Sequence, residues 1–457
     1  MFNPETAAIR FGTGLSPNIA PPGSVSDILD RLSETDKMAA RFPIDGFHII
    51  TKATSEIKRL NKLRRKEPDR SQELRKKVRK IKKKAKYWQL DWLQATIARG
   101  VYTDDAMRER LVLFWKDHFT AQGKQGVMKR AMSSYVEDVI RPNVTGKFAD
   151  MLKAVTFHPM MLYYLDQVKS VGPNSVVAVK KPGRGLNENL AREVLELHTL
   201  GVDGAYTQND VRELAKLFAG LTYERKGGFS YVANMAEPGA ETVLGKSYGG
   251  NIQDLFHVTD FLDDLAVHPD TARHLAKKLV VHFVSDLPDP ELVDHVTAAY
   301  LASGGDLMQS YRALLEHPAA WVMPATKVKP PIQFIISSIR ALGVAEKTLM
   351  KSKPKEITNL VIAPMGLMGQ LWENPIGPDG WPEDANHWIS PQGLAARIQW
   401  AMSAPQQIRR DLPEPRSFVH TALGSRASQS LQVASARAES KSIGVGLILA
   451  SPEFQRK

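Results

Sequence analysis

The chain has 457 residues, of which 43% are hydrophobic and 24% charged, proportions typical of a globular protein with room for one large or several ordinary domains. It contains no cysteine, which excludes disulfides, cysteine-ligated zinc, iron–sulfur clusters and thiol nucleophiles. The net charge of +12 comes from one segment, because residues 57–86 hold sixteen Lys or Arg against three acids, whereas the remainder holds 45 basic and 46 acidic residues.

Helical patterns dominate the first hundred residues. Residues 1–56 predict an N-terminal segment of short helices separated by turns. Residues 57–100 predict a basic helical arm, interrupted at Pro68 because proline cannot continue a helix interior. Thr103 is a residue type that caps helices and is followed by two acids, so we expect the next helix to start there and run to about Thr120.

The β-structure that we expect lies within residues 101–371, which otherwise predict a helical core. Leu221–Tyr223 and Phe229–Tyr231 flank Lys226-Gly227-Gly228, a pattern typical of a hairpin. Residues 242–244 are expected to add a strand.

Three His-Pro dipeptides, beginning at His158, His268 and His317, each precede a helical pattern. Proline suits the first helical position, where its missing N–H would have no partner. Residues 372–457 predict a loop rich in Trp, Gly and Pro, followed by C-terminal helices that pack on the core. The predicted fold class is therefore mainly α, a large multi-helix domain with a small β-hairpin insert near residues 220–250.

An acid-rich helix is predicted from Glu188 to Gly201, with Asn187 as its cap and the glycine at its end. Glu188, Arg192 and Glu196 are spaced four residues apart, so the arginine can bridge the two carboxylates. Asn189 and Glu193 fall on the same face.

This face has two interpretations. In the structural one, Glu188, Asn189 and Arg192 form a polar network between two packed layers, with His198 as a hydrogen-bonded histidine on the apolar side. In the catalytic one, the face is a cleft wall on which carboxylates bind a cation or act as acid and base. The candidate catalytic residues are then Glu193, Glu196 and, from another helix, His118. We predict no metal site, since Glu-x-x-Glu-x-His is not a recognised ligand spacing.

The basic segment 57–86 also has two interpretations. It is either a helical arm that packs one narrow apolar face, or a contact for an anionic polymer or lipid surface. The cations that we assign to such a contact are Lys76, Lys77, Lys80 and Lys83. Arg184, which lies between two glycines ahead of a helix N-terminus, is a further candidate anion ligand. Aromatic residues for stacking are missing before Tyr87, which disfavours sequence-specific nucleic-acid recognition.

Residues 187–221, NENLAREVLELHTLGVDGAYTQNDVRELAKLFAGL, closely resemble the signature of the bacterial family catalogued as domain of unknown function 1800. Arg10-Phe11-Gly12, Trp115 with His118-Phe119, and Gly380-Trp381 agree with it in order. The resemblance implies a partner similar to the alkaline-phosphatase and sulfatase group, and an envelope location. Where many relatives carry a His-Asp pair, this chain has Ala236-Glu237-Pro238-Gly239.

The N-terminal sequence lacks a basic region followed by an apolar run, and no stretch approaches the roughly 18 apolar residues of a membrane helix. We therefore expect no transmembrane segment and a cytoplasmic location, against the envelope location that the resemblance implies. Three functions stay open. The first is a non-catalytic helical scaffold or binding protein that acts with a partner. The second is a hydrolytic enzyme, metal-assisted or not, that uses residues 188–198, and the third is polyanion binding through residues 57–86. The sequence does not indicate a cofactor, which stays unknown.

Overall fold

The computed structural model describes residues 1–181, 183–224, 228–323 and 325–457. It is built mainly from helices, with two small antiparallel hairpins, which confirms the predicted fold class. Lys226 and Gly227 of the expected hairpin turn lie outside the described residues. No helix in the described ranges is long and apolar enough to cross a membrane.

The N-terminal helices are short, as the turns in the sequence predict. They are α1 (Pro4–Arg10), α2 (Val25–Ser33) and α3 (Lys37–Arg41).

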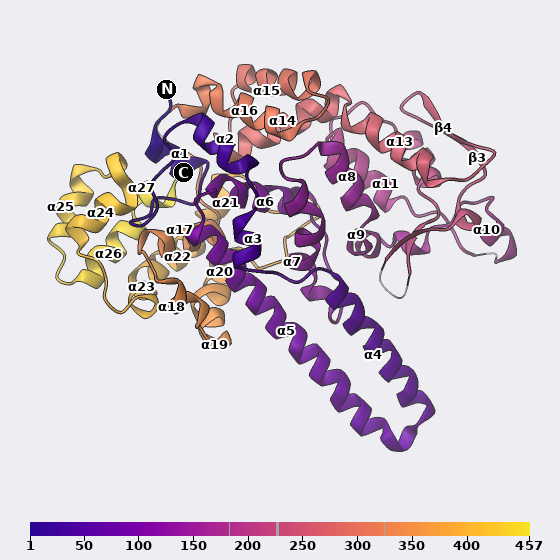
Figure 1. Cartoon of the computed structure of the whole chain (residues 1–457), viewed down its shortest axis with the longest axis horizontal. Helices are drawn as coiled ribbons and strands as arrows, with labels where there is room; N and C mark the ends of the chain where they lie inside the picture. The colour runs from indigo at the N-terminus through magenta and orange to yellow at the C-terminus, as the bar shows by residue number, and fades with distance from the viewer. Residues whose placement is uncertain (182, 225–227, 324) are drawn as a thin grey trace.

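The next two helices, α4 (His48–Lys66) and α5 (Ser71–Tyr102), form a long antiparallel hairpin that projects from the body of the protein (Figure 1). The 3-10 turn η1 (Pro68–Arg70) joins them, so the chain reverses where proline interrupts the helical pattern. Leu60 and Leu74, 3% and 1% exposed, pack in the hairpin. The last part of α5 leaves the arm and enters the core, where Leu93 and Ile97 are fully buried.

Helix α6 (Ala106–His118) crosses the centre of the protein and buries Met107, Leu111, Phe114 and His118, which recur at helical spacing. Its N-cap is Asp105, whose carboxylate accepts the Arg108 N–H at 3.2 Å, and not Thr103 as the sequence suggested. Thr103 instead ends α5, where its N–H donates to the Arg99 carbonyl. The Thr103 hydroxyl makes no hydrogen bond within the described structure, so it caps neither helix.

A second group of helices surrounds α6 and carries the acid-rich signature. It comprises α7 (Met132–Tyr135), η3 (Val136–Ile140), α8 (Phe148–Phe157), α9 (Pro159–Tyr164), α10 (Val176–Lys180), α11 (Asn189–Glu193), η6 (Val194–Thr199) and α12 (Gln208–Leu217).

The predicted β insert near residues 220–250 is present, but it consists of two separate hairpins. Strand β1 (Leu221–Tyr223) pairs with β2 (Phe229–Tyr231), with Leu221 opposite Tyr231. Strand β3 (Gly239–Val243) pairs with β4 (Lys246–Gly250), so the strand expected near residues 242–244 is present but belongs to the second hairpin. Leu244 is not in a strand, because its φ of 52° places it in the turn before Gly245.

The later helices follow the predicted order. They are α13 (Leu255–Ala266), α14 (Pro269–Phe283), α15 (Pro290–Ala302), α16 (Leu307–Glu316) and α17 (Pro331–Ala341). All three His-Pro dipeptides start a helix, because each histidine accepts the backbone N–H two residues later on its Nδ1, at 3.1 to 3.3 Å.

The C-terminal part is a cluster of short helices around α22. These helices are α18 (Glu346–Met350), α19 (Pro354–Ile357), α20 (Ala363–Leu367), α21 (Ala385–Trp388), α22 (Pro391–Ser403), α23 (Pro405–Ile408), α24 (Pro415–Leu423), α25 (Gln429–Ala436), α26 (Lys441–Ala450) and α27 (Pro452–Gln455). They share one hydrophobic core with α17 and the second half of α5, whereas α6, α8 and α11–α16 share the other. The loop between α20 and α21 bridges these two cores.

Candidate functional site

The acid-rich signature is not a single regular helix. Helix α11 gives way after Glu193 to the π-helical turn η6, which ends at Thr199. Asn187 does hold the start, since its side-chain oxygen accepts the Asn189 N–H at 2.9 Å. A π turn changes the angular spacing of the residues that follow it, so Glu196 no longer shares a face with Glu188 and Arg192.

Arg192 therefore bridges different partners from those that the sequence predicted. Its guanidinium donates to Glu188 at 3.3 Å and to the Gln208 side-chain oxygen at 3.0 Å. Gln208 in turn donates to Glu188 at 2.9 Å, which ties α11 to α12. The described residues contain no ion pair between Arg192 and Glu196, whose carboxylate instead takes a hydrogen bond from Tyr206. Glu188, Arg192 and Gln208 thus form one polar network between α11 and α12.

Glu193 lies in an acidic neighbourhood. Burial raises the pKa of its carboxyl to about 7, and the negative charges of Glu196 and Asp379 add to this effect while Arg192 opposes it. Asp379 belongs to the loop after α20, far from Glu193 in the sequence. No local sequence pattern could therefore predict that these two carboxylates lie near each other. Glu193 is not among the residues that line any of five pockets in the described part of the structure.

His118 and His198 lie in a buried aromatic cluster and not against the carboxylates. Each is 2% exposed, and the His118 ring centre lies 6.2 Å from that of His198 and 6.2 Å from that of His274. The His118 Nε2 donates to the His198 carbonyl at 3.1 Å, which assigns the proton to that nitrogen.

Burial and then the positive charge of Lys278 lower the pKa of His198 to about 3 and that of His274 to about 4, so both rings are neutral. Within the described ranges, no group of three or more His, Asp or Glu residues has the geometry to hold a metal ion. The structure thus brings Glu193 close to Glu196 but gives His118 no contact with either carboxylate among the described residues.

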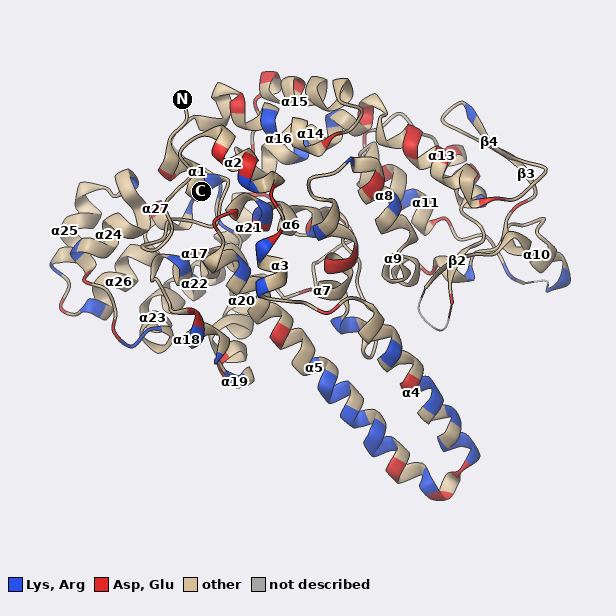
Figure 2. Ribbon diagram, viewed as in Figure 1, with Lys and Arg blue, Asp and Glu red and all other residues tan. Residues whose placement is uncertain are grey.

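Lys and Arg are concentrated along α4 and α5 of the basic arm (Figure 2). Thirteen of the sixteen Lys and Arg in residues 57–86 make no ion pair within the described structure, and the other three are Arg59, Arg70 and Lys77. Lys76, Lys80 and Lys83 are exposed. Between residues 48 and 86, no large hydrophobic side chain is exposed, because Leu60 and Leu74 are buried between the two helices.

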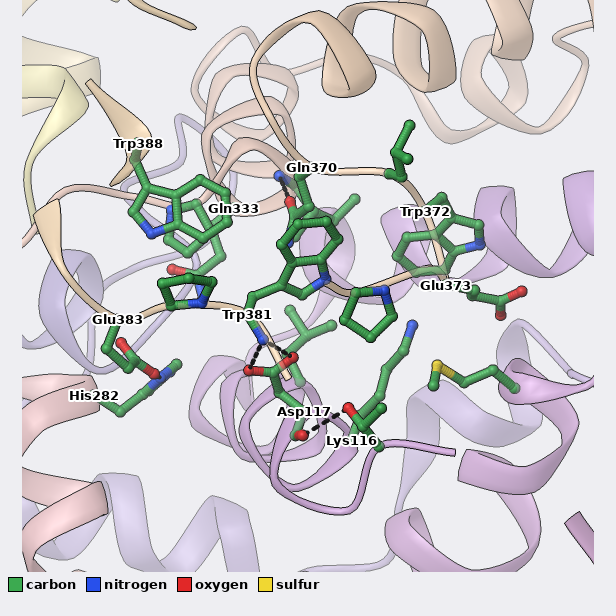
Figure 3. A pocket seen from close by; sticks show the side chains of 18 residues that line it. Lys116, Asp117, His282, Gln333, Gln370, Trp372, Glu373, Trp381, Glu383 and Trp388 are labelled. Carbon is green, nitrogen blue, oxygen red and sulfur yellow. Dashed lines mark hydrogen bonds and ion pairs between the residues drawn. The ribbon is translucent and has the colours of Figure 1, made fainter. Parts of the chain in front are cut away.

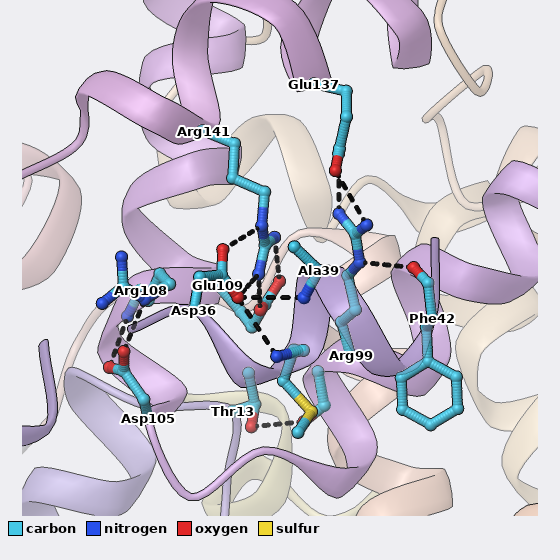
Figure 4. A network of polar contacts seen from close by, with 12 residues as sticks. Thr13, Asp36, Ala39, Phe42, Arg99, Asp105, Arg108, Glu109, Glu137 and Arg141 are labelled. Atoms are coloured by element: carbon cyan, nitrogen blue, oxygen red, sulfur yellow. Dashed lines mark hydrogen bonds and ion pairs between the residues drawn. The ribbon is translucent and has the colours of Figure 1, made fainter. Parts of the chain in front are cut away.

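A polar network fixes the root of the arm on the body (Figure 4). Arg99 of α5 donates to both oxygens of Glu137 at 2.8 and 3.0 Å and to the Phe42 carbonyl at 2.9 Å. Next to it, Arg141 pairs with Glu109 at 2.6 Å and with Asp36 at 2.5 Å. These contacts hold the two long helices at a defined angle to the core.

Arg184 lies apart from the arm, in the exposed loop between α10 and α11. It makes no ion pair with the described residues. The structure therefore does not unite Arg184 and the arm lysines in one anion site.

A small pocket with a cavity volume of about 60 Å³, partly open to solvent, lies between α6, the start of α17 and the loop after α20 (Figure 3). Its walls are largely apolar and come from Trp372, Trp381 and Trp388 together with several prolines. The sequence analysis noted the Trp-rich loop as a separate feature, but only the fold places it over the end of α6.

Asp117 anchors the loop on α6. Its two carboxylate oxygens lie 3.0 Å from the backbone N of Trp381, which donates to them. Gly380 has a φ of 86° and passes so close that a Cβ there would lie 2.6 Å from the Asp117 Cγ. Burial raises the pKa of the Asp117 carboxyl to about 7, against the effect of the Trp381 N–H.

Lys116 and Glu373 occupy the opposite side of the pocket. The Lys116 ammonium lies 3.7 Å from the centre of the Trp372 ring, and burial lowers its pKa. Glu373 has a φ of 56°, rare for a residue other than glycine. Its carboxylate accepts hydrogen bonds from Gln89, at 2.8 Å, and from Ser133. Sequence reasoning missed Lys116, Asp117 and Glu373 because they do not belong to any recognisable sequence motif.

The model of the family described as Protein of unknown function (DUF1800) matches residues 8–456. The chain belongs to this family. Membership in DUF1800 agrees with the resemblance found in residues 187–221, and the match extends over the arm, the pocket and both cores. Searches of curated proteins and of solved structures found no match.

Proposed function

We propose that this protein is a non-catalytic binding protein that holds a linear polyanion on its arm, residues 48–86. The observation that carries the proposal is the unpaired charge of thirteen Lys and Arg on a projecting two-helix hairpin. Cations without carboxylate partners can neutralise a polymer's charges and release its counterions, which favours binding. The rigid root at Arg99 supports this role, because it presents the arm away from the body.

An anionic polymer fits the arm better than a lipid surface does. Helices that lie in a membrane interface expose an apolar face that enters the acyl region. Here Leu60 and Leu74 are almost fully buried, and no large hydrophobic side chain of residues 48–86 is exposed. Binding then rests on charge alone and is independent of the polymer's sequence.

The test is a titration of the full-length protein with fluorescently labelled duplex DNA and, separately, labelled heparin, at several salt concentrations. If six cations contact B-DNA phosphates, the logarithm of the binding constant falls with the logarithm of salt with a slope of about −5. The triple variant Lys76→Gln, Lys80→Gln, Lys83→Gln reduces the size of that slope by about 2 to 3.

The matched control removes three exposed lysines elsewhere, Lys347, Lys351 and Lys355. This control binds like the wild type if the arm is the site. Equal loss in both triple variants, or a binding constant that does not change with salt, would refute the proposal. Vesicles with anionic headgroups serve as the competing ligand, and preferential binding to them would also count against it.

The other two hypotheses remain predictions. A hydrolytic site needs a hollow beside Glu193 and Glu196, and neither residue lines any of the five pockets described by their lining residues. A partner similar to the alkaline-phosphatase and sulfatase group rests on the family resemblance, and a pull-down from the native host is the measurement that bears on it.

A further inference from the structure

A cavity of about 350 Å³ lies between α2, α3 and the start of α6. This volume falls within the roughly 300–1,000 Å³ typical of small-ligand sites. Part of the wall is apolar and comes from Ile19, Ala20 and Met38, and most of the remainder is charged. No residue of the basic arm lines it, so the cavity is separate from the surface proposed to bind a polyanion.

Acids outnumber bases in the wall of this cavity. Its charged side chains are Asp27, Asp30, Glu34, Asp36, Asp104 and Asp105, with Arg31, Lys37 and Arg108. Each base already has a carboxylate of the same wall as its partner, in the pairs Arg31–Asp27 at 2.7 Å, Lys37–Glu34 at 2.5 Å and Arg108–Asp105 at 2.6 Å. Asp36 pairs with Arg141, which lies outside the cavity (Figure 4). Four of the six carboxylates are therefore balanced by a cation.

The other two carboxylates, those of Asp30 and Asp104, form no ion pair within the described structure. The Asp30 carboxylate accepts one hydrogen bond, from the Ser26 hydroxyl at 3.2 Å. At Asp104 it is the backbone carbonyl, not the side chain, that accepts the Arg31 guanidinium, at 3.0 Å. Two negative charges thus border one cavity without a cation partner.

The Thr103 side chain adds a buried polar group without a partner. Thr103 lines the cavity and is 1% exposed, and its hydroxyl makes no hydrogen bond with the described residues. Its backbone N–H donates to the Arg99 carbonyl and its carbonyl accepts the Arg340 guanidinium at 2.8 Å. Neither arginine lines the cavity, so the side chain is the part of Thr103 that borders it. Buried polar atoms without partners are rare and call for a ligand or water.

These features favour a ligand with two positive charges and an apolar middle. Two carboxylates attract two ammonium groups, the hydroxyl oxygen can accept an ammonium N–H, and methylene groups can pack on Ile19 and Met38. A metal ion fits less well, because the described residues hold no group of three or more acids or histidines placed to bind one. We propose that this cavity binds a small aliphatic diamine through Asp30, Asp104 and the Thr103 hydroxyl.

The first test is calorimetric titration of the full-length protein with 1,4-diaminobutane and 1,5-diaminopentane at constant, low ionic strength. We expect saturable binding of at least one diamine with a Kd below about 10 mM. Butylamine, which has one ammonium on the same chain, should bind at least about threefold more weakly, because it leaves one carboxylate unpaired. Absence of saturation with both diamines, or equal or tighter binding of butylamine or Mg²⁺, overturns the proposal.

The second test locates the site with Thr103→Val and Asp104→Asn. Thr103→Val keeps the shape of the side chain, and its hydroxyl has no partner in the protein, so the melting temperature should not fall. We expect diamine affinity to fall about three- to fivefold in each variant. Asp203→Asn, an exposed aspartate outside the cavity, is the matched control and should bind like the wild type. Unchanged affinity in either cavity variant, or an equal loss in the control, overturns the assignment.

Discussion

Arg141 is the residue whose removal should destabilise the protein most clearly. Its side chain is only 4% exposed, and it donates two hydrogen bonds to Glu109, at 2.6 and 3.0 Å, and two to Asp36, at 2.5 and 2.9 Å. Arg141→Met keeps most of the volume but removes all four hydrogen bonds. Glu109, whose side chain is 6% exposed, is then left as a buried carboxylate without its cation.

The expected loss of stability follows from the burial of Glu109. Breaking a buried ion pair by removing one partner costs about 3–5 kcal/mol, because the remaining charge stays desolvated. Asp36 adds little, since its side chain is 22% exposed and it still caps α3 through the N–H groups of Met38 and Ala39. We therefore expect a loss of about 4 kcal/mol in the free energy of unfolding of Arg141→Met.

The assay is urea unfolding followed by circular dichroism, with the double variant Arg141→Met, Glu109→Leu as the control. Removing both charges leaves no buried carboxylate without its cation. The free energy of unfolding of the double variant should therefore lie within about 1–2 kcal/mol of that of the wild type. A single variant that loses less than about 1 kcal/mol would refute the reasoning. So would a double variant that is less stable than the single one, since the carboxylate would then not be the cause.

Three further predictions concern Glu193, the Asp117 anchor and the arm. Because the pKa of Glu193 is raised to about 7 in the folded protein, its contribution to stability is complete below its unfolded pKa and is lost as pH rises through 7. Glu193→Gln should therefore melt at a higher temperature than the wild type at pH 8 and at the same temperature near pH 4, and the opposite order would contradict the assigned shift. Gly380→Ala should cost more than about 1 kcal/mol, because its φ of 86° and the 2.6 Å approach to Asp117 leave no room for a Cβ; an unchanged melting temperature would exclude that contact. Leu74→Ala should cost about 2–5 kcal/mol locally, measured as faster amide exchange in α4 and α5 but not in α22. Uniform exchange would mean that the hairpin does not pack as described.

The arm and the helix starts could be foreseen because they rest on neighbouring residues. Proline at position 68 interrupts the helix wherever the chain folds, and His-Pro pairs cap helices through a hydrogen bond that spans two residues. The hydrophobic stripe of α6 likewise follows from spacing alone. The same reasoning failed at Thr103, since α5 continues as far as Tyr102 and the N-cap of α6 is Asp105.

The candidate sites were only partly foreseeable. Spacing placed Glu188 and Arg192 together, but it could not reveal the π turn after Glu193 that separates Glu196 from them. Asp117 lies next to His118 in the sequence, yet the neighbouring residues give no sign of its role. That role depends on the loop of residues 372–388, which folds over it and donates the Trp381 N–H to its carboxylate.

By itself, the sequence determined the helical class, the family and the concentration of positive charge in residues 57–86, since periodicity, capping and charge counts are properties of short stretches of chain. Only the tertiary structure decided which carboxyls are buried, which cations stay unpaired and which loop covers Asp117. The reason is physical: the free energy of a charge or a hydrogen-bond donor depends on groups hundreds of residues away, and their distance from it is set by packing and not by sequence separation.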